Sequence, residues 1–143
     1  MQTISKMWIH VIWATKHRQP MLRKDFREQV FEHITERAGQ EGIFMRVING
    51  TEDHLHCLFR WFPKHTISTV INRIKGGSSH WINTQNFLRN RFAWQKGYSA
   101  FSVSESLVED VRRYILKQES HHRKLSYAEE IEYLLDLHGV ERQ

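Results

Sequence analysis

The 143-residue chain contains a single cysteine, Cys57, so it cannot form an intrachain disulfide. One thiol suits a reducing compartment, and we therefore expect a cytoplasmic protein. No apolar run approaches the roughly 20 residues that a membrane-spanning helix needs. The N-terminal residues also lack the apolar core of a signal peptide. These absences argue against the secreted and membrane classes.

Several enzyme motifs are missing as well. The sequence has no Gly-x-Gly-x-x-Gly, no Walker loop, no zinc-type cysteine pairs and no His-Glu-x-x-His. Nucleotide-driven chemistry and zinc proteolysis therefore have no support. With only 2 Pro and 7 Gly but 40% hydrophobic residues, the composition is that of a globular protein. No repeat or linker divides the chain, so we expect one domain over residues 1–143.

Acidic residues are absent from one long segment. Between His54 and Ser104 there is no Asp or Glu, in a chain whose net charge is +5. The basic side chains of this segment alternate with aromatic ones and are Arg60, Lys64, Arg73, Lys75, Arg89, Arg91 and Lys96. Such a segment is either a solvated basic face or a surface that neutralises phosphates and stacks the bases of a single strand. On the second interpretation, we expect phosphate contacts at Arg73, Lys75 and Lys96.

The first half of the chain predicts a strand, a helix and a hairpin. Met7–Ala14 is aromatic and β-branched, which is typical of a strand. Apolar residues at every fourth position over 26–38 predict an amphipathic helix. Asn49-Gly50 separates two apolar runs, so we expect antiparallel strands at about 43–48 and 53–60 with these two residues as the turn.

The second half predicts more helix. Apolar spacing over 67–81 indicates a helix that is interrupted or loosened at Gly76-Gly77, followed by extended structure over 91–103. A helical pattern then covers 107–118, and Ser126-x-x-Glu129 is a capping box that begins a short last helix. The resulting order β-α-β-β-α-β-α predicts an α+β, ferredoxin-like (split βαβ) antiparallel sheet with helices on one face, a tyrosine-bearing helix and a short C-terminal helix.

Two histidines lie two residues apart in the second strand of the expected hairpin. Because side chains alternate along a strand, His54 and His56 point to the same face and Cys57 to the opposite one. Two neighbouring imidazoles on a rigid element are the kind of donor pair that a divalent metal needs. A chance His-x-His pair is the competing interpretation, because the chain has 10 His. We expect Cys57 to be a small buried hydrophobe.

Tyr114 and Gln118 lie four residues apart on the third predicted helix and therefore share a face. Tyr114 lies on the apolar stripe, where a tyrosine is commonly a core aromatic. Gln118 is less usual there, because a buried amide needs hydrogen-bond partners. Spacing alone leaves both a structural and a functional role open.

Together these motifs resemble the single-tyrosine HUH transposases of the insertion sequence 200/605 type. The resemblance rests on His54-Leu-His-Cys-Leu followed much later by Tyr114-Ile-Leu-Lys-Gln. Further matching segments occur in the same order and are Trp13-Ala-Thr-Lys-His-Arg, Ile74-Lys-Gly-Gly-Ser-Ser, Trp94 to Ser104 and His121-His-Arg-Lys. Related host-encoded enzymes associated with repetitive palindromes share these motifs.

The resemblance implies an activity and a set of site residues. It implies that His54, His56 and Gln118 hold Mg²⁺ or Mn²⁺. It also implies that Tyr114 attacks a DNA phosphodiester, which leaves a 5′-phosphotyrosine and a free 3′-OH. The implied substrate is single-stranded DNA with hairpins at element ends.

The implied assembly is a homodimer, in which one subunit's tyrosine helix lies over the other's histidines. The sequence shows no general base for Tyr114. Two other classes remain open, namely a non-catalytic single-strand nucleic-acid-binding module and a metal-dependent phosphodiesterase that uses water.

Overall fold

The aromatic and β-branched segments form one four-stranded antiparallel sheet in the computed structural model, which describes residues 1–118 and 125–140. The strands, in the spatial order β2-β3-β1-β4, are β1 (Met7–Ala14), β2 (Phe44–Gly50), β3 (His54–Trp61) and β4 (Ser99–Val103). The central pair is antiparallel along its whole length, with Ala14 opposite His54. Since β3 lies between β1 and β2, the sheet has the predicted split βαβ arrangement.

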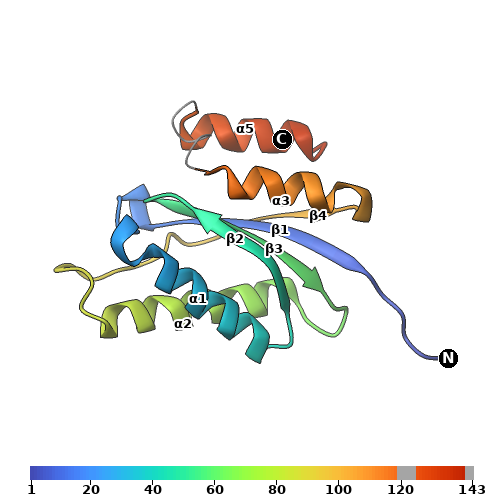
Figure 1. Cartoon of the computed structure of the whole chain (residues 1–143), viewed down its shortest axis with the longest axis horizontal. Helices are drawn as coiled ribbons and strands as arrows, with labels where there is room; N and C mark the ends of the chain where they lie inside the picture. The colour runs from blue at the N-terminus through green and yellow to red at the C-terminus, as the bar shows by residue number, and fades with distance from the viewer. Residues whose placement is uncertain (119–124, 141–143) are drawn as a thin grey trace.

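Helices cover both faces of this sheet (Figure 1). The helical elements are η1 (Lys16–Arg18), α1 (Lys24–Gln40), α2 (Ile67–Thr84), η2 (Glu105–Leu107), α3 (Val108–Leu116) and α5 (Tyr127–Leu137). The helices α1 and α2 pack on one face, and α3 and α5 lie on the other. The predicted fold class is confirmed, and so is the capping box at Ser126 and Glu129. None of the helices in the described residues is long and apolar enough to span a membrane.

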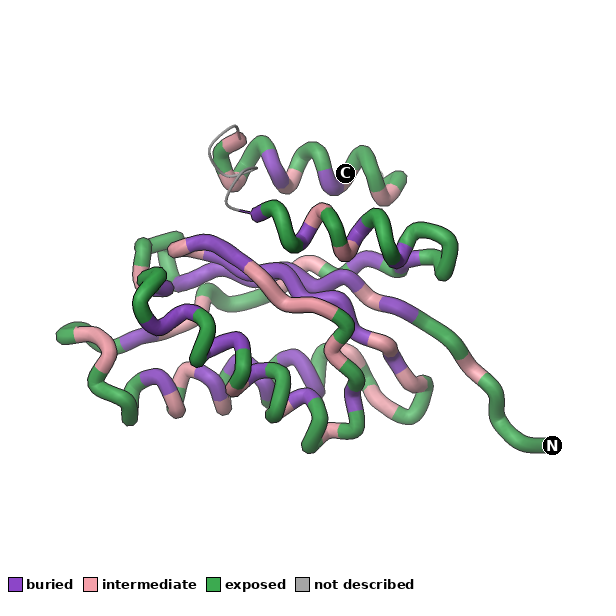
Figure 2. Tube along the Cα trace, viewed as in Figure 1, coloured by how far each residue is buried: buried purple, intermediate pink, exposed green. Residues whose placement is uncertain are grey.

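The alternation of β3 divides its side chains between the two layers. Leu55, Cys57 and Phe59 belong to the core beneath α1 and α2, and Cys57 is fully buried as predicted. His54 and His56 point the other way, toward α3 and α5. Figure 2 shows the central strands buried between the two helical layers. The two histidines are therefore held on the most protected strand of the sheet.

The predicted turn at Asn49-Gly50 is wrong, because both residues end β2 and the chain reverses at 51–53. Asn49 Nδ2 donates instead to the carbonyls of Ile115 and Leu116, at 3.0 and 3.2 Å, at the end of α3. Gly50 is required by a close approach, since a Cβ at this position would lie 2.3 Å from the His54 carbonyl oxygen. Asn49 therefore connects β2 to the end of α3, and Gly50 lets β2 approach the β3 backbone beside His54.

The predicted interruption of the second helix is also wrong. The helix α2 continues through Gly76 and Gly77, because residues on both sides of the glycines, Ile74 and Ser78 among them, are buried. The expected extended region over 91–103 is regular only in β4.

These two glycine environments predict opposite effects of alanine. We expect Gly50→Ala to lower the free energy of unfolding by about 1–3 kcal/mol, because backbone atoms of β3 must move. Gly76→Ala should raise it by roughly 0.5–1 kcal/mol, since this exposed helical position has no atom within 4 Å of the added Cβ. Urea unfolding of both variants measures the difference, and equal effects would contradict the close approach at Gly50.

Candidate active site

The two histidines of β3 lie side by side in the interior. Both are 0% exposed, and their ring centroids are 5.3 Å apart. Their alternation with the apolar residues of β3 fixes them on the face beneath α3 and α5. The sequence therefore places two imidazoles together on a rigid strand, as predicted.

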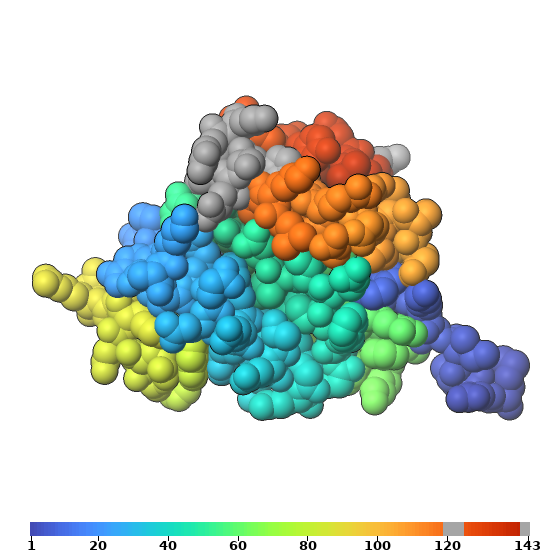
Figure 3. Space-filling model, viewed as in Figure 1, coloured from blue at the N-terminus to red at the C-terminus, as the bar shows by residue number. Residues whose placement is uncertain are grey.

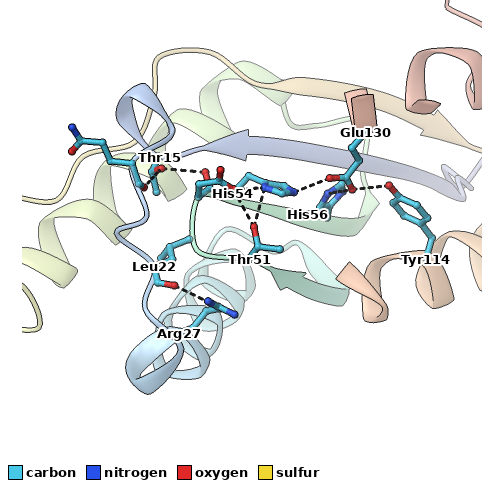
Figure 4. Close-up of polar contacts among 10 residues, drawn as sticks. Thr15, Leu22, Arg27, Thr51, His54, His56, Tyr114 and Glu130 are labelled. Atoms are coloured by element: carbon cyan, nitrogen blue, oxygen red, sulfur yellow. Dashed lines mark hydrogen bonds and ion pairs between the residues drawn. The ribbon is translucent and has the colours of Figure 1, made fainter. Parts of the chain in front are cut away.

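A carboxylate from α5 completes this pair. Glu130 is 1% exposed, and its Oε2 lies 3.0 Å from His54 Nε2. Its Oε1 lies 3.1 Å from His56 Nε2. One ligand atom from each of the three residues lies within 4.8 Å of the others, which is close enough for a single ion. Figure 4 shows the three side chains converging from β3 and α5.

Each imidazole is oriented from its far side. His54 Nδ1 lies 2.7 Å from Asp53 Oδ1 and 3.0 Å from Thr51 Oγ1. His56 Nδ1 lies 2.9 Å from the Nε2 of His10 on β1. Metal-binding histidines commonly have such partners, which fix the ring and direct the other nitrogen at the ion. Two imidazole nitrogens and a carboxylate fit a divalent transition ion, and Mn²⁺ matches this mixed set better than Mg²⁺, which prefers oxygen.

Tyr114 reaches the same carboxylate from α3. Its hydroxyl donates to Glu130 Oε1 at 2.6 Å, and its ring centroid lies 5.9 Å from that of His56. The helix α3 is held here by its buried residues Val111 and Ile115, which pack against the sheet. A tyrosine hydroxyl and two imidazoles therefore meet at one buried carboxylate.

The charges in this cluster depend on one another. Burial alone would lower the pKa of His54, but hydrogen bonds to Asp53 and Glu130 outweigh it and raise the pKa to about 9. Burial would raise the pKa of Glu130, but hydrogen bonds from His54, His56 and Tyr114 hold it well below its usual range. Burial and then the hydrogen bond to Glu130 raise the pKa of Tyr114 above its ordinary value. Without an ion, the cluster is thus a protonated His54 beside an ionised Glu130.

The family model described as "Transposase IS200 like" matches residues 3–118, which include β1, the histidine pair and Tyr114. The chain belongs to the IS200-like transposase family. The ISDra2 transposase TnpA of Deinococcus radiodurans is 25% identical over 120 residues, which cover 80% of this chain and 84% of that protein. The IS200 transposase of Salmonella typhimurium is 24% identical over 124 residues, which cover 82% of each chain.

Solved structures agree on the fold of this family member. A Deinococcus radiodurans crystal structure assigned as a transposase superposes with a TM-score of 0.68 at 24% identity, covering 82% of this chain and 95% of that one. A REP-associated tyrosine transposase bound to a REP hairpin gives a TM-score of 0.53 at 14% identity, covering 80% and 68%. Both support the ferredoxin-like arrangement of the sheet and helices.

The family resemblance pointed to Gln118, and the structure places this residue just beyond α3. Its side chain is fully buried, and within residues 1–118 and 125–140 neither amide atom makes a hydrogen bond of good geometry. The amide lies near enough to the Tyr114 hydroxyl to favour the ionised phenol. Burying an amide without hydrogen-bond partners is costly. The Gln118 oxygen is therefore a candidate acceptor or ligand atom beside the cluster. The basic segment His121-His-Arg-Lys lies outside the described residues.

The three predicted phosphate contacts lie away from the histidines. Arg73 and Lys75 belong to α2, on the opposite face of the sheet, and Arg73 pairs with Glu41 at 3.2 Å. Lys75 is buried, and its Nζ donates to the carbonyls of Gln95 and Gly97 at 2.8 and 2.7 Å. Of the three basic residues, only Arg73 and Lys96 are exposed.

Sequence reasoning missed Glu130, although the last helix contains a signal for it. Tyr127, Ile131 and Leu134 form the buried or partly buried stripe of α5, and Glu130 lies on that stripe, four residues before Leu134. A carboxylate on an apolar helix face needs partners when it is buried. The position therefore indicated a polar site beneath α5, without showing which residues form it.

Proposed function

We propose that this IS200-like transposase cleaves and rejoins single-stranded DNA, with Tyr114 as the nucleophile. The observation that carries the proposal is that the Tyr114 hydroxyl and the Nε2 atoms of His54 and His56 meet at the Glu130 carboxylate. The phenol oxygen bonds to phosphorus and the bond to the 3′ oxygen breaks, which leaves a 5′-phosphotyrosine and a free 3′-OH. A second 3′-OH can then reverse the step without ATP, which agrees with the missing nucleotide motifs.

Glu130 supplies the proton acceptor that the sequence did not show. Its Oε1 is 2.6 Å from the Tyr114 hydroxyl, within the reach required of a general base. The phenol proton passes to this oxygen as the phenol attacks, and the departing 3′ oxygen takes up a proton in its turn. In the metal-free chain, hydrogen bonds from His54, His56 and Tyr114 hold the pKa of Glu130 well below its usual range. Once the His54 proton has been displaced, the charge of the ion would keep Glu130 ionised.

We propose that His54, His56 and Glu130 hold the Mg²⁺ or Mn²⁺ ion, with the Gln118 amide oxygen as a further ligand. The ion would act as a Lewis acid on the phosphate and the leaving oxygen. Gln118 suits this role because its oxygen is buried and, among the described residues, accepts no hydrogen bond. Asp53 and His10 hold the two rings from behind.

Labelled single-stranded DNA tests the activity. With Mn²⁺, a DNA–protein adduct that resists denaturation should form on strands carrying insertion-sequence ends or palindromic hairpins, and excess EDTA should prevent it. Comparing the adduct yields on the two kinds of strand shows which of them is the substrate. Cleavage without any adduct would instead support a phosphodiesterase that uses water, and binding without cleavage would support a binding module.

Proton competition predicts how the affinity for Mn²⁺ depends on pH. Below pH 9, His54 carries the proton that pairs it with Glu130, and an ion must displace it. We therefore expect the Mn²⁺ affinity to rise about tenfold per pH unit as the pH approaches 9, and to level off above it. Calorimetry in buffers of different ionisation enthalpy measures the released proton. An affinity that does not change over this range would place the ion elsewhere.

We also propose that the acid-free segment binds the DNA backbone outside the reactive centre. Each phosphate contact releases counterions, so Arg73→Ala and Lys96→Ala should each reduce the log–log salt slope of binding by about one unit. Lys75→Ala should instead lower stability, because its ammonium holds two loop carbonyls. Lys24→Ala, outside the segment, serves as the control. Unchanged slopes in both exposed variants would show that the DNA lies on another face.

A homodimer remains part of the proposal. Within one chain, Tyr114 already reaches the cluster formed by His54, His56 and Glu130, so a shared site requires α3 to be exchanged between subunits. Co-expressed His54→Ala and Tyr114→Phe subunits, each inactive alone, should recover activity if the site is shared. The mixture stays inactive if each chain uses its own tyrosine, and a monomer by light scattering would exclude the dimer.

A further inference from the structure

A row of three histidines runs from the proposed metal ligand His56, through the buried His10, to the partly buried His138. His10 on β1 is 1% exposed, and its ring stacks on that of His56 with centroids 5.1 Å apart. Its Nε2 lies 2.9 Å from His56 Nδ1, and its Nδ1 lies 3.4 Å from His138 Nε2. His138 in turn stacks on Phe101, with centroids 4.4 Å apart and rings within 3° of parallel. The His10 ring is therefore fixed on two sides.

We propose that His10 is a positioning residue for His56, holding the ring so that Nε2 faces the ion. This inference rests on the proposed function, since it assumes an ion at His54, His56 and Glu130. An imidazole can bind an ion through one nitrogen while its other nitrogen carries a proton, and that proton needs an acceptor in a buried site. His10 Nε2 is placed to be the acceptor.

The sheet register explains why a side chain of this length is used. His10 pairs with Leu58 across the β1–β3 ladder, so it lies diagonally from His56 on the same face. Backbone carbonyls of the strands point along the sheet and are occupied by its ladder. A long polar side chain on β1 is thus the element that reaches His56 Nδ1 from above the sheet. His54 has a different solution, because the Asp53 carboxylate accepts its proton.

Substituting Gln or Asn for His10 tests its two contacts one at a time. The amide of Gln at this position would lie where His10 Nε2 lies, and would keep the bond to His56. The amide of Asn would lie where Nδ1 lies, and would keep the contact with His138 while losing His56. We expect His10→Gln to bind Mn²⁺ within about threefold of the unchanged protein, and His10→Asn to bind it roughly 10- to 100-fold more weakly.

The affinity is measured by electron paramagnetic resonance of free Mn²⁺, without DNA. Thermal melting without metal checks that each variant is folded. His33→Asn is the matched control, because this ring stacks on Trp81 on the other side of the sheet and should leave the affinity unchanged. If His10→Asn does not fold, His10→Phe replaces it, since it fills the space with an apolar ring and also removes the acceptor.

The outcomes separate this inference from the proposed function. If His54→Ala abolishes Mn²⁺ binding but His10→Asn and His10→Gln bind equally well, the role of His10 is overturned and the metal site stands. If the unchanged protein and His54→Ala bind Mn²⁺ equally weakly, the metal site itself is overturned, and the role of His10 with it. Weak binding by Asn together with recovery by Gln supports the inference.

Discussion

Tyr114→Phe should form no adduct with single-stranded DNA while remaining folded and able to bind the strand. The change removes one oxygen and keeps the ring, which packs against His56 and Tyr133. Glu130 loses one of its donors but keeps its contacts with His54 and His56, so we expect a stability loss of about 1–3 kcal/mol. Cleavage should fall to background, because phenylalanine offers no nucleophile. Denaturing gels measure the adduct, circular dichroism measures folding and stability, and a titration measures binding to the single strand.

Two neighbouring tyrosines provide matched controls. Tyr133 stacks on Tyr114, and Tyr127 packs against His54, with ring centroids 5.9 and 4.9 Å apart. Phenylalanine at either position should leave the adduct intact. A full yield of adduct from Tyr114→Phe, or mass spectrometry that finds the DNA on Tyr127 or Tyr133, would refute the assignment.

Glu130→Gln should reduce cleavage by about 10²–10⁴, the range that a general base commonly contributes. The amide keeps the shape of the carboxylate, but it loses the charge that accepts the phenol proton and attracts the ion. Mn²⁺ binding should weaken in the same variant. Glu129→Gln is the control, because this exposed neighbour only caps α5 and does not touch the cluster.

The opposite result would have a clear meaning. Faster cleavage by Glu130→Gln would show that the carboxylate occupies the place of the DNA phosphate and inhibits the reaction. Gln118→Ala distinguishes the two candidate third ligands, because Mn²⁺ binding that depends on Gln118 and not on Glu130 would assign the ion to the amide oxygen.

The sequence predicted the parts of the site that depend on local geometry. His54 and His56 share a face because side chains alternate on any strand, and the same alternation places Cys57 in the opposite core. Glu130 is 76 residues from His54, and His10 is 46 residues from His56. Their contacts depend on how α5 and β1 pack, which residue spacing does not encode. The turn predicted at Asn49-Gly50 was wrong for a related reason. These residues contact α3 and β3, which are distant in the sequence or in another element, and they do not form a turn.

The position of α5 has a consequence for how the protein meets DNA. In the space-filling view the side chains of α3 and α5 lie against each other over this face (Figure 3), and His54, His56 and Glu130 are at most 1% exposed. We expect a phosphate to enter only when α5 shifts, and because α5 carries Glu130, the helix must return before this carboxylate can act. The measured DNA affinity would then equal the intrinsic affinity multiplied by the fraction of molecules that are open. Each 1.4 kcal/mol or so of packing at Leu134 lowers that fraction about tenfold. The packing of α5 therefore sets the fraction of molecules whose active site DNA can reach.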